Sequence, residues 1–81
     1  MSEPFELEII KQDSSEKIPV DWIEVESPSG NFVVGPDHSE VISLLKYRGK
    51  LKYKQHGGTE IEIDTYSGLF KFEKNRATIL I

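Results

Sequence analysis

Apolar and polar residues alternate in four separate segments of this chain, and this alternation limits the possible folds more than any other feature. The alternating segments are Phe5–Lys11, Trp22–Ser27, Lys50–Lys54 and Glu60–Asp64. A period of two places successive side chains on opposite faces of a β-strand, so each segment has one face for a core and one for water. The sequence therefore predicts an all-β domain.

Proline, glycine and polar residues separate these segments at short intervals. Ser27–Asn31 combines proline and glycine in the order of a turn, and Gln55–Gly58 forms the tip of a hairpin between the lysine-rich and the acidic segments. Short strands are also expected at Leu69–Phe72 and Ala77–Ile81. Short strands with turn signals roughly every 8 to 12 residues are typical of an antiparallel sandwich or barrel.

Two segments carry mixed signals. Lys11–Lys17 is polar and rich in turn formers, and Pro19 lacks the N–H that a central strand needs, so we expect a loop or a ragged edge there. Val41–Tyr47 fits a helical face in part. Its short length and its two β-branched residues favour a strand.

The composition excludes several classes of protein. The 81 residues make one domain spanning residues 1–81, and without cysteine the chain has neither disulfides nor thiolate chemistry. Its net charge of −4 argues against a general nucleic-acid binder. No segment approaches the roughly 20 apolar residues of a membrane crossing, and the N-terminus lacks the basic and apolar regions of a signal peptide. We therefore expect a soluble protein with no direct membrane insertion.

The residues that often carry chemistry form no recognisable site. Asp37, His38 and Ser39 are the three residue types of a hydrolase triad, but consecutive residues cannot stand behind one another as triad members do. His38 and His56 lie in different turns without spaced partners for a metal ion. The glycines after His56 lack the lysine and hydroxyl residues of a phosphate loop. We expect no catalytic, metal-binding or cofactor-binding residue.

A basic set with interleaved tyrosines stands out in an otherwise acidic chain. Such a pattern occurs in single-strand nucleic-acid binders, but it also suits contact with an acidic protein or the solvated face of two strands. Because the net charge is negative, we favour a protein contact and expect no nucleic-acid partner. The set consists of Lys46, Arg48, Lys50, Lys52 and Lys54, with Tyr47 and Tyr53 between them.

The stretch GNFVVGPDHSEVISLLKYRGKLKYKQHGG, residues 30–58, resembles the epsilon subunit of bacterial F-type (rotary) ATP synthases. That family carries a glycine, a short apolar strand, a proline-glycine-histidine corner, an apolar strand, and a glycine before an alternating hairpin. Ser67-Gly68-Leu69-Phe70 looks like its glycine-glycine turn, and Thr78–Leu80 is similar to its closing strand. The resemblance covers Phe5 to Leu80. The positions in register are Gly30, Phe32, Pro36, His38, Leu45, Gly49 and Leu51.

This resemblance implies the family's N-terminal β-sandwich, or flattened barrel, of about ten short strands. It implies a non-catalytic central-stalk subunit that binds the gamma subunit, contacts the polar loops of the c-ring, and couples proton-driven rotation to ATP synthesis. Such a subunit is cytoplasmic and peripheral to the inner (plasma) membrane. The family's C-terminal helical hairpin would begin near Ile81, so we expect a naturally short epsilon or an excised domain without that hairpin.

Carried over by position, the resemblance also assigns contact residues. The chain departs from the family where Asp37 replaces a glycine, Ser39-Glu40 replaces alanine-proline, and Ser67 replaces a glycine. These changes motivate an alternative hypothesis, a diverged β-sandwich scaffold with a different partner. The expected contacts with the gamma subunit are His38, Ser39, Val41 and Ser43, and those with the c-ring are Ser29, Gly30 and Asn31.

Overall fold

The computed structural model describes residues 3–81, which form an all-β fold, as the alternation predicts. These described residues contain eight strands rather than about ten, and the segment Val41–Tyr47 contributes a strand, as expected. The strands are β1 (Phe5–Ile10), β2 (Ser15–Ser27), β3 (Gly30–Val34), β4 (Val41–Leu44), β5 (Gly49–Gln55), β6 (Glu60–Thr65), β7 (Leu69–Glu73) and β8 (Arg76–Leu80).

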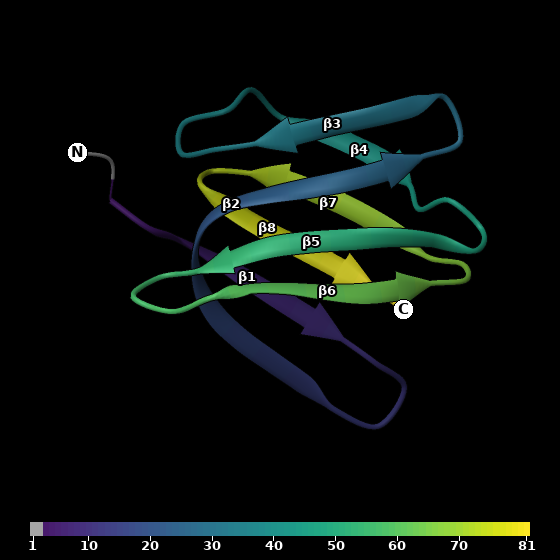
Figure 1. Ribbon diagram of the computed structural model, residues 1–81, viewed down its shortest axis with the longest axis horizontal. Coiled ribbons are helices and arrows are strands. Elements are labelled where there is room, and N and C mark those ends of the chain that lie inside the picture. The colour runs from purple at the N-terminus through teal and green to yellow at the C-terminus, as the bar shows by residue number, and fades with distance from the viewer. Residues whose placement is uncertain (1–2) are drawn as a thin grey trace.

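The strands follow one hydrogen-bonded path that folds over itself into two layers. The order along the path is β4-β7-β8-β1-β2-β5-β6, and β3 pairs with β2. Figure 1 shows β3, β2, β5 and β6 in front of β4, β7, β8 and β1. All pairs are antiparallel except β1 and β8, which are parallel. The predicted antiparallel sandwich thus contains one parallel pair, which joins strands from the two ends of the chain.

Strand β2 connects the two layers. A loop is found at Lys11–Ser14, as predicted, but the strand begins at Ser15, which corrects the rest of the loop or ragged edge expected before residue 20. Its register with β1 runs from Ser15 to Val20, whereas its register with β5 begins only at Val20, so Pro19 lies before the ladder with β5 and its missing N–H breaks no pair there. The Pro19 carbonyl accepts a hydrogen bond from His56 N at 2.9 Å. Between Val20 and Trp22 the register with β5 shifts. A shift of this kind bends a strand, and here it carries β2 from the rear layer into the front layer.

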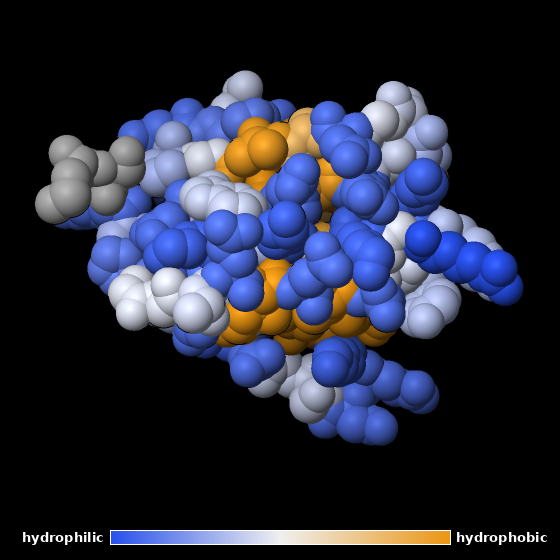
Figure 2. All heavy atoms as spheres, viewed as in Figure 1, coloured by the Kyte–Doolittle hydropathy of each residue, from blue (hydrophilic) through white to orange (hydrophobic). Residues whose placement is uncertain are grey.

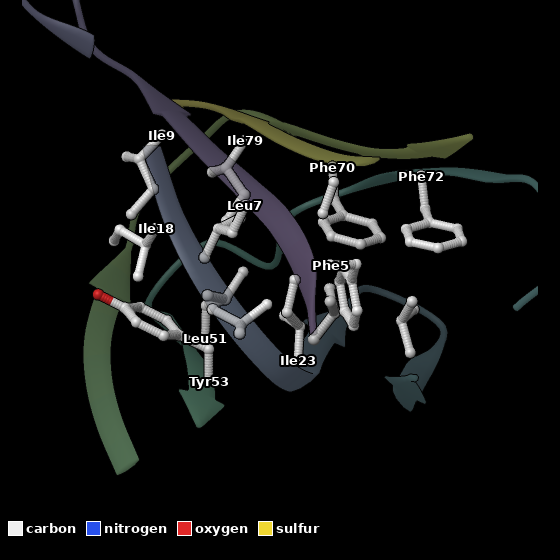
Figure 3. Close-up of a cluster of buried hydrophobic side chains, with 14 of the residues drawn as sticks. Phe5, Leu7, Ile9, Ile18, Ile23, Leu51, Tyr53, Phe70, Phe72 and Ile79 are labelled. Carbon is white, nitrogen blue, oxygen red and sulfur yellow. The ribbon is translucent and has the colours of Figure 1, made fainter. Parts of the chain in front are cut away.

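The core lies between the layers and is built from the inward positions of the alternating strands. Figure 3 shows Phe70 and Phe72 pointing from β7 toward Ile23 and Leu51. Phe5 meets Phe72 edge to face, with ring centroids 5.4 Å apart. Such pairs contribute about 0.5–1.5 kcal/mol beyond the burial of their area. The buried hydrophobic residues are Phe5, Leu7, Ile9, Ile18, Val20, Ile23, Val25, Val34, Leu45, Leu51, Tyr53, Phe70, Phe72, Ala77 and Ile79.

The β5–β6 hairpin forms as predicted, with its lysines opposite its acidic residues. Lys52 pairs with Glu62 in the register, and the rows on either side pair Lys50 with Asp64 and Lys54 with Glu60. The Lys50 ammonium lies 3.2 Å from the Glu62 carboxylate and 3.4 Å from that of Asp64, and these acids raise the pKa of Lys50. Figure 2 shows hydrophilic side chains over much of the face formed by β3, β2, β5 and β6, with apolar areas between them. Hydrophilic side chains thus interrupt the apolar surface of this face.

Candidate protein-binding site

The outer face of the other layer carries a row of apolar side chains. The register places Leu44 of β4 beside Leu69 of β7, Leu69 beside Leu80 of β8, and Leu80 beside Ile10 of β1. We call these four residues the apolar row. Leu44 is 63% exposed and Leu80 is 43% exposed, and Ile42, one step along β4, is 67% exposed. Exposed apolar groups that adjoin one another in this way are typical of protein interfaces.

The apolar row faces outward because its strands alternate. Phe70 points into the core, so Leu69 and Lys71 on either side of it point out, and the same rule turns Leu80 outward beside buried Ile79. Away from the row, the face becomes charged. Lys71 forms a 2.8 Å ion pair with Glu73, which lowers the pKa of the Glu73 carboxyl. An apolar centre beside a charged margin is the usual anatomy of a protein-binding surface.

Two tyrosines lie in the connections that continue from this face. The Leu45 amide donates to the Gly68 carbonyl at 3.1 Å, so the connection after β4 runs beside the connection before β7. Tyr47 and Tyr66 belong to these connections, and their exposed rings meet edge to face at 6.3 Å. The Arg48 guanidinium lies 5.6 Å from the centroid of the Tyr47 ring. Tyrosine and arginine are the residue types most often found at the energetic centres of interfaces.

The residues expected to contact a gamma subunit divide between the surface and the interior. His38 and Ser39 are exposed, whereas Val41 and Ser43 are half-buried opposite the inward positions of β7. The outward positions of β4 are Ile42 and Leu44, which the sequence prediction did not name. The strand reads Val-Ile-Ser-Leu, so its residue types alone do not indicate which of its faces points outward.

The connection Gly35–Ser39, which we call the His38 corner, is held in place by Asn75 from the β7–β8 turn. The Asp37 amide donates to Asn75 Oδ1 at 2.7 Å, and Asn75 Nδ2 donates to Asp37 Oδ1 at 2.8 Å. The His38 ring packs edge to face on Phe72, with centroids 6.1 Å apart. Its Nδ1 lies 2.7 Å from the Ser39 carbonyl oxygen. Asp37 and His38 therefore bond to other groups instead of forming a catalytic triad with Ser39.

The residues expected to contact a c-ring lie where β2 turns into β3: Ser29 is in the turn, and Gly30 and Asn31 are the first two residues of β3. Ser29, Gly30 and Asn31 are all exposed, and we call them the tip. The Ser27 hydroxyl donates to the Gly30 carbonyl at 2.6 Å and closes this turn. Because β3 runs from Gly30 to Val34, the tip and the His38 corner lie at opposite ends of β3 (Figure 1). The two expected contact surfaces are thus separated by the length of one strand.

His56 joins a small polar cluster away from the His38 corner. His56 Nδ1 lies 2.9 Å from Asp21 Oδ1, and the Lys54 ammonium lies 3.4 Å from Asp21 Oδ2. The hydrogen bond from His56 is the main cause that lowers the pKa of the Asp21 carboxyl. Within residues 3–81, no three side chains of the metal-binding types gather at one place.

The basic set divides between the β5–β6 hairpin and the connection after β4, and of its two tyrosines only Tyr47 is exposed. Lys50 and Lys52 are engaged with acidic residues of β6, and Tyr53 is buried in the core. Stacking on single-stranded nucleic acid requires exposed aromatic rings. In the described part of the chain, moreover, no helix has the length and apolar character that a membrane crossing requires.

Comparisons with known proteins identify the fold and the family. The model of the ATP synthase delta/epsilon chain β-sandwich domain matches residues 4–81. No curated protein sequence matches the chain significantly. A chain in the cryo-EM structure of the Euglena gracilis mitochondrial ATP synthase (OSCP/F1/c-ring in rotational state 1) superposes with a TM-score of 0.87 at 19% identity, covering 99% of this chain and 51% of that one. A chain in the cryo-EM structure of the Tetrahymena thermophila mitochondrial ATP synthase (central stalk and c-ring) superposes with a TM-score of 0.75 at 13% identity, covering 93% of this chain and 60% of that one. This chain thus spans little more than half the length of these structural relatives.

Proposed function

Because this chain belongs to the ATP synthase delta/epsilon chain β-sandwich family, we propose that it is a non-catalytic central-stalk domain of an F-type ATP synthase. In this role it binds the gamma subunit and contacts the polar loops of the c-ring. The contacts transmit proton-driven rotation to the catalytic head, where ATP is made. The domain works at the periphery of the membrane that holds the synthase, on the cytoplasmic side.

The observation that supports this proposal best is the apolar row. A stalk domain must hold a rotating partner firmly, and an apolar patch with a charged margin supplies hydrophobic association and orientation together. Leu44 of the row and Ile42 beside it are more than 60% exposed, so covering them with a partner removes apolar surface from water. The row is therefore the surface where contact with a gamma subunit would contribute most hydrophobic free energy of binding.

The tip is the proposed contact with the c-ring. It lies at the end of the molecule where β4 also finishes, since the Lys46 amide donates to the Glu26 carbonyl at 3.0 Å. Ser29 and Asn31 supply short polar side chains that suit the polar loops of a ring. A single end of the sandwich thus presents the tip to one partner while the adjoining outer face meets another.

The test replaces one residue of the apolar row and compares it with a matched exposed residue on the other layer. Leu44→Lys places a charge in the proposed interface, whereas Val33→Lys does the same on the hydrophilic face, where Val33 is 56% exposed. We expect Leu44→Lys to weaken binding to the purified gamma subunit by about tenfold to a hundredfold, the range of an interface hot spot. Val33→Lys should leave the affinity unchanged.

Affinity is measured by isothermal titration calorimetry, and urea unfolding confirms that both variants are folded. Equal binding by Leu44→Lys and the unmodified chain would remove the apolar row from the interface. A gamma subunit that ignores the unmodified chain would overturn the stalk function and favour a scaffold with another partner.

A further inference from the structure

Strand β4 has one edge that no other strand covers within residues 3–81. It pairs with β7 alone, and Figure 1 places it behind β3 at the border of the rear layer. The Leu45 amide donates to the Gly68 carbonyl, on the side of β7. Because alternate residues of a strand turn their backbone groups to the same side, those of Ile42 and Leu44 point to the uncovered edge. The Leu44 carbonyl accepts a hydrogen bond from the Ser43 hydroxyl at 3.0 Å, so a local side chain takes the place of a strand.

The residues of β4 lack the features that keep uncovered edges apart. Charged side chains, proline and bulges normally prevent two edge strands from pairing. Val41–Leu44 contains none of these, and Ile42 and Leu44 are more than 60% exposed. By contrast, β6 carries three acidic residues that would repel those of a second copy, and β3 begins with a glycine, which weakens a strand. Of these three edges, β4 is the one suited to pairing with another strand.

The two ends of β4 carry opposite charges. Glu40 precedes the strand and Lys46 follows it, and both residues are exposed. Within residues 3–81, neither side chain takes part in an ion pair. A strand with an acid before it and a base after it is complementary to its own reversed copy.

The other charged groups near Glu40 face a different acid. Lys71 pairs with Glu73, which is the main cause that raises the pKa of Lys71, and Glu40 adds only a smaller coulombic contribution. Lys74 also acts on Glu73, because it adds to the lowering of the Glu73 pKa that Lys71 mainly causes. The register sets Arg76 opposite Glu73 as well. Glu40 is therefore the acid at this end of β4 that is left for another molecule.

The charges near Lys46 leave that end of β4 basic. The Glu26 carbonyl accepts from the Lys46 amide at 3.0 Å, but the Glu26 carboxylate turns to the Lys50 amide, 2.8 Å away. The Arg48 guanidinium, 5.6 Å from the centroid of the Tyr47 ring, adds a second positive charge. An acidic group from another molecule would therefore be attracted to this end.

We propose that a second copy of this chain covers the edge of β4, with the two β4 strands antiparallel and paired around Ser43. In this arrangement Ile42 of each copy lies opposite Leu44 of the other, so both exposed side chains gain an apolar neighbour. The Glu40 end of each strand meets the Lys46 end of the other, and the two-fold symmetry makes this contact twice. A parallel arrangement would set Glu40 beside Glu40, so the charges select the antiparallel one.

This inference does not rest on the proposed function, because self-association requires no gamma subunit. Leu44 belongs both to the apolar row and to the dimer contact. The dimer and a complex with the gamma subunit through the apolar row therefore exclude one another.

The first experiment is sedimentation equilibrium of the isolated chain. Four residues per strand make a small interface, so we expect a weak dimer with a dissociation constant on the order of 10–100 µM. Ile42→Lys places a charge on the edge and should raise this constant at least about tenfold. Val33→Lys, on β3, is the matched control and should leave it unchanged, and urea unfolding confirms that both variants are folded. An unmodified chain that stays monomeric at about 1 mM would overturn the inference.

The second experiment reverses the charges at the ends of β4. Glu40→Lys brings two bases together at each end of the dimer, and Lys46→Glu brings two acids together. Each change should weaken the dimer about tenfold, since two exposed ion pairs become two repulsions. A chain with both changes regains complementary ends and should dimerise like the unmodified chain. If neither single change weakens the dimer, the antiparallel pairing around Ser43 is wrong.

The third experiment uses the absence of cysteine from the chain, which makes an introduced thiol a specific reporter. Ser43 lies opposite Ser43 of the second copy, at a Cα separation of about 4.5–5.5 Å that a disulfide can bridge. Ser43→Cys should therefore form a covalent dimer on oxidation. Ser29→Cys, at the exposed tip, is the control and should stay monomeric.

The outcomes separate this inference from the proposed function. A covalent dimer from Ser29→Cys but not from Ser43→Cys would place the contact at the tip and overturn the inference. A chain that stays monomeric but binds the gamma subunit through Leu44 would leave the stalk function intact and reserve β4 for gamma. A chain that dimerises through Ser43→Cys but ignores gamma would support the inference and overturn the stalk function.

Discussion

Gly68 occupies the position in this fold where a single methyl group should do most damage. It lies between the end of β6 and the start of β7, with a φ of 143°. A Cβ atom built on Gly68 would overlap the backbone carbonyl oxygen of Leu80 and would lie 3.2 Å from Ile81 Cγ2. Neither the carbonyl nor its strand can move alone, because Leu80 pairs with both Leu69 and Ile10 in the sheet.

The expected cost of Gly68→Ala combines two effects. Forcing a non-glycine residue into this backbone conformation costs on the order of 1–3 kcal/mol. Displacing the β8 backbone to make room costs roughly another 1–3 kcal/mol, as for other overpacked sites. We therefore expect a loss of about 4 kcal/mol in the free energy of unfolding, a large part of the roughly 4–12 kcal/mol available to a domain of this size.

Gly57→Ala is the matched control for the backbone part of this cost. Gly57 also has a positive φ, 71°, but a Cβ built there meets nothing within 4 Å. Its replacement should cost about 1–2 kcal/mol, the penalty of a left-handed conformation alone. Urea unfolding followed by tryptophan fluorescence measures both variants, since the chain has one tryptophan. If Gly68→Ala loses no more stability than Gly57→Ala, the close approach of Gly68 to Leu80 is not a determinant of stability.

Three further predictions concern the core, the His38 corner and the polar cluster. Phe70→Ala leaves a cavity in the core and should lower the free energy of unfolding, measured by urea titration, by about 3–5 kcal/mol. A loss below about 1 kcal/mol would contradict the packing of Phe70 in the core. Asn75→Ala removes both hydrogen bonds to Asp37 and should speed hydrogen exchange of the Asp37 amide, whereas unchanged exchange would show that the corner is held by other contacts. The hydrogen bond from His56 is the chief cause that lowers the carboxyl pKa of Asp21 below its ordinary value of 3.8. Ionised Asp21 therefore stabilises the fold above pH 3.8, and this contribution disappears as the pH falls through the lowered pKa. Unfolding measured from acidic to neutral pH should thus show a weaker acid dependence for Asp21→Asn, and identical pH profiles would refute this linkage.

The strands that the sequence predicts well are those whose alternation is unbroken. In β1 as far as Ile9 and in the β5–β6 hairpin, apolar and charged residues alternate, so the face that points inward is evident from the residues themselves. The pairing of Lys52 with Glu62 follows from the short turn between their strands. Local information is sufficient here because the partner strands are neighbours in the chain.

Pro19 and the outward face of β4 depend instead on strands that are distant in the chain. Whether a proline can occupy a strand depends on which strand lies beside it, and the ladder between β2 and β5 begins only after Pro19, at Val20. In β4 three of four residues are apolar, so the choice between the two faces depends on how the strand meets β7. The outward position of Leu44 could not be read from its neighbours in the sequence.

The sequence by itself determined the all-β class, the hairpin, the exposed tip and the resemblance to the epsilon subunit, because each depends on short-range periodicity or on residues at fixed spacing. Only the tertiary structure decided the surfaces. The parallel pairing of β1 with β8 aligns Ile10 with Leu80 and completes the apolar row, and the bonds between Asp37 and Asn75 orient His38. These contacts join residues far apart in the chain, and their geometry depends on how two layers of strands pack around one core.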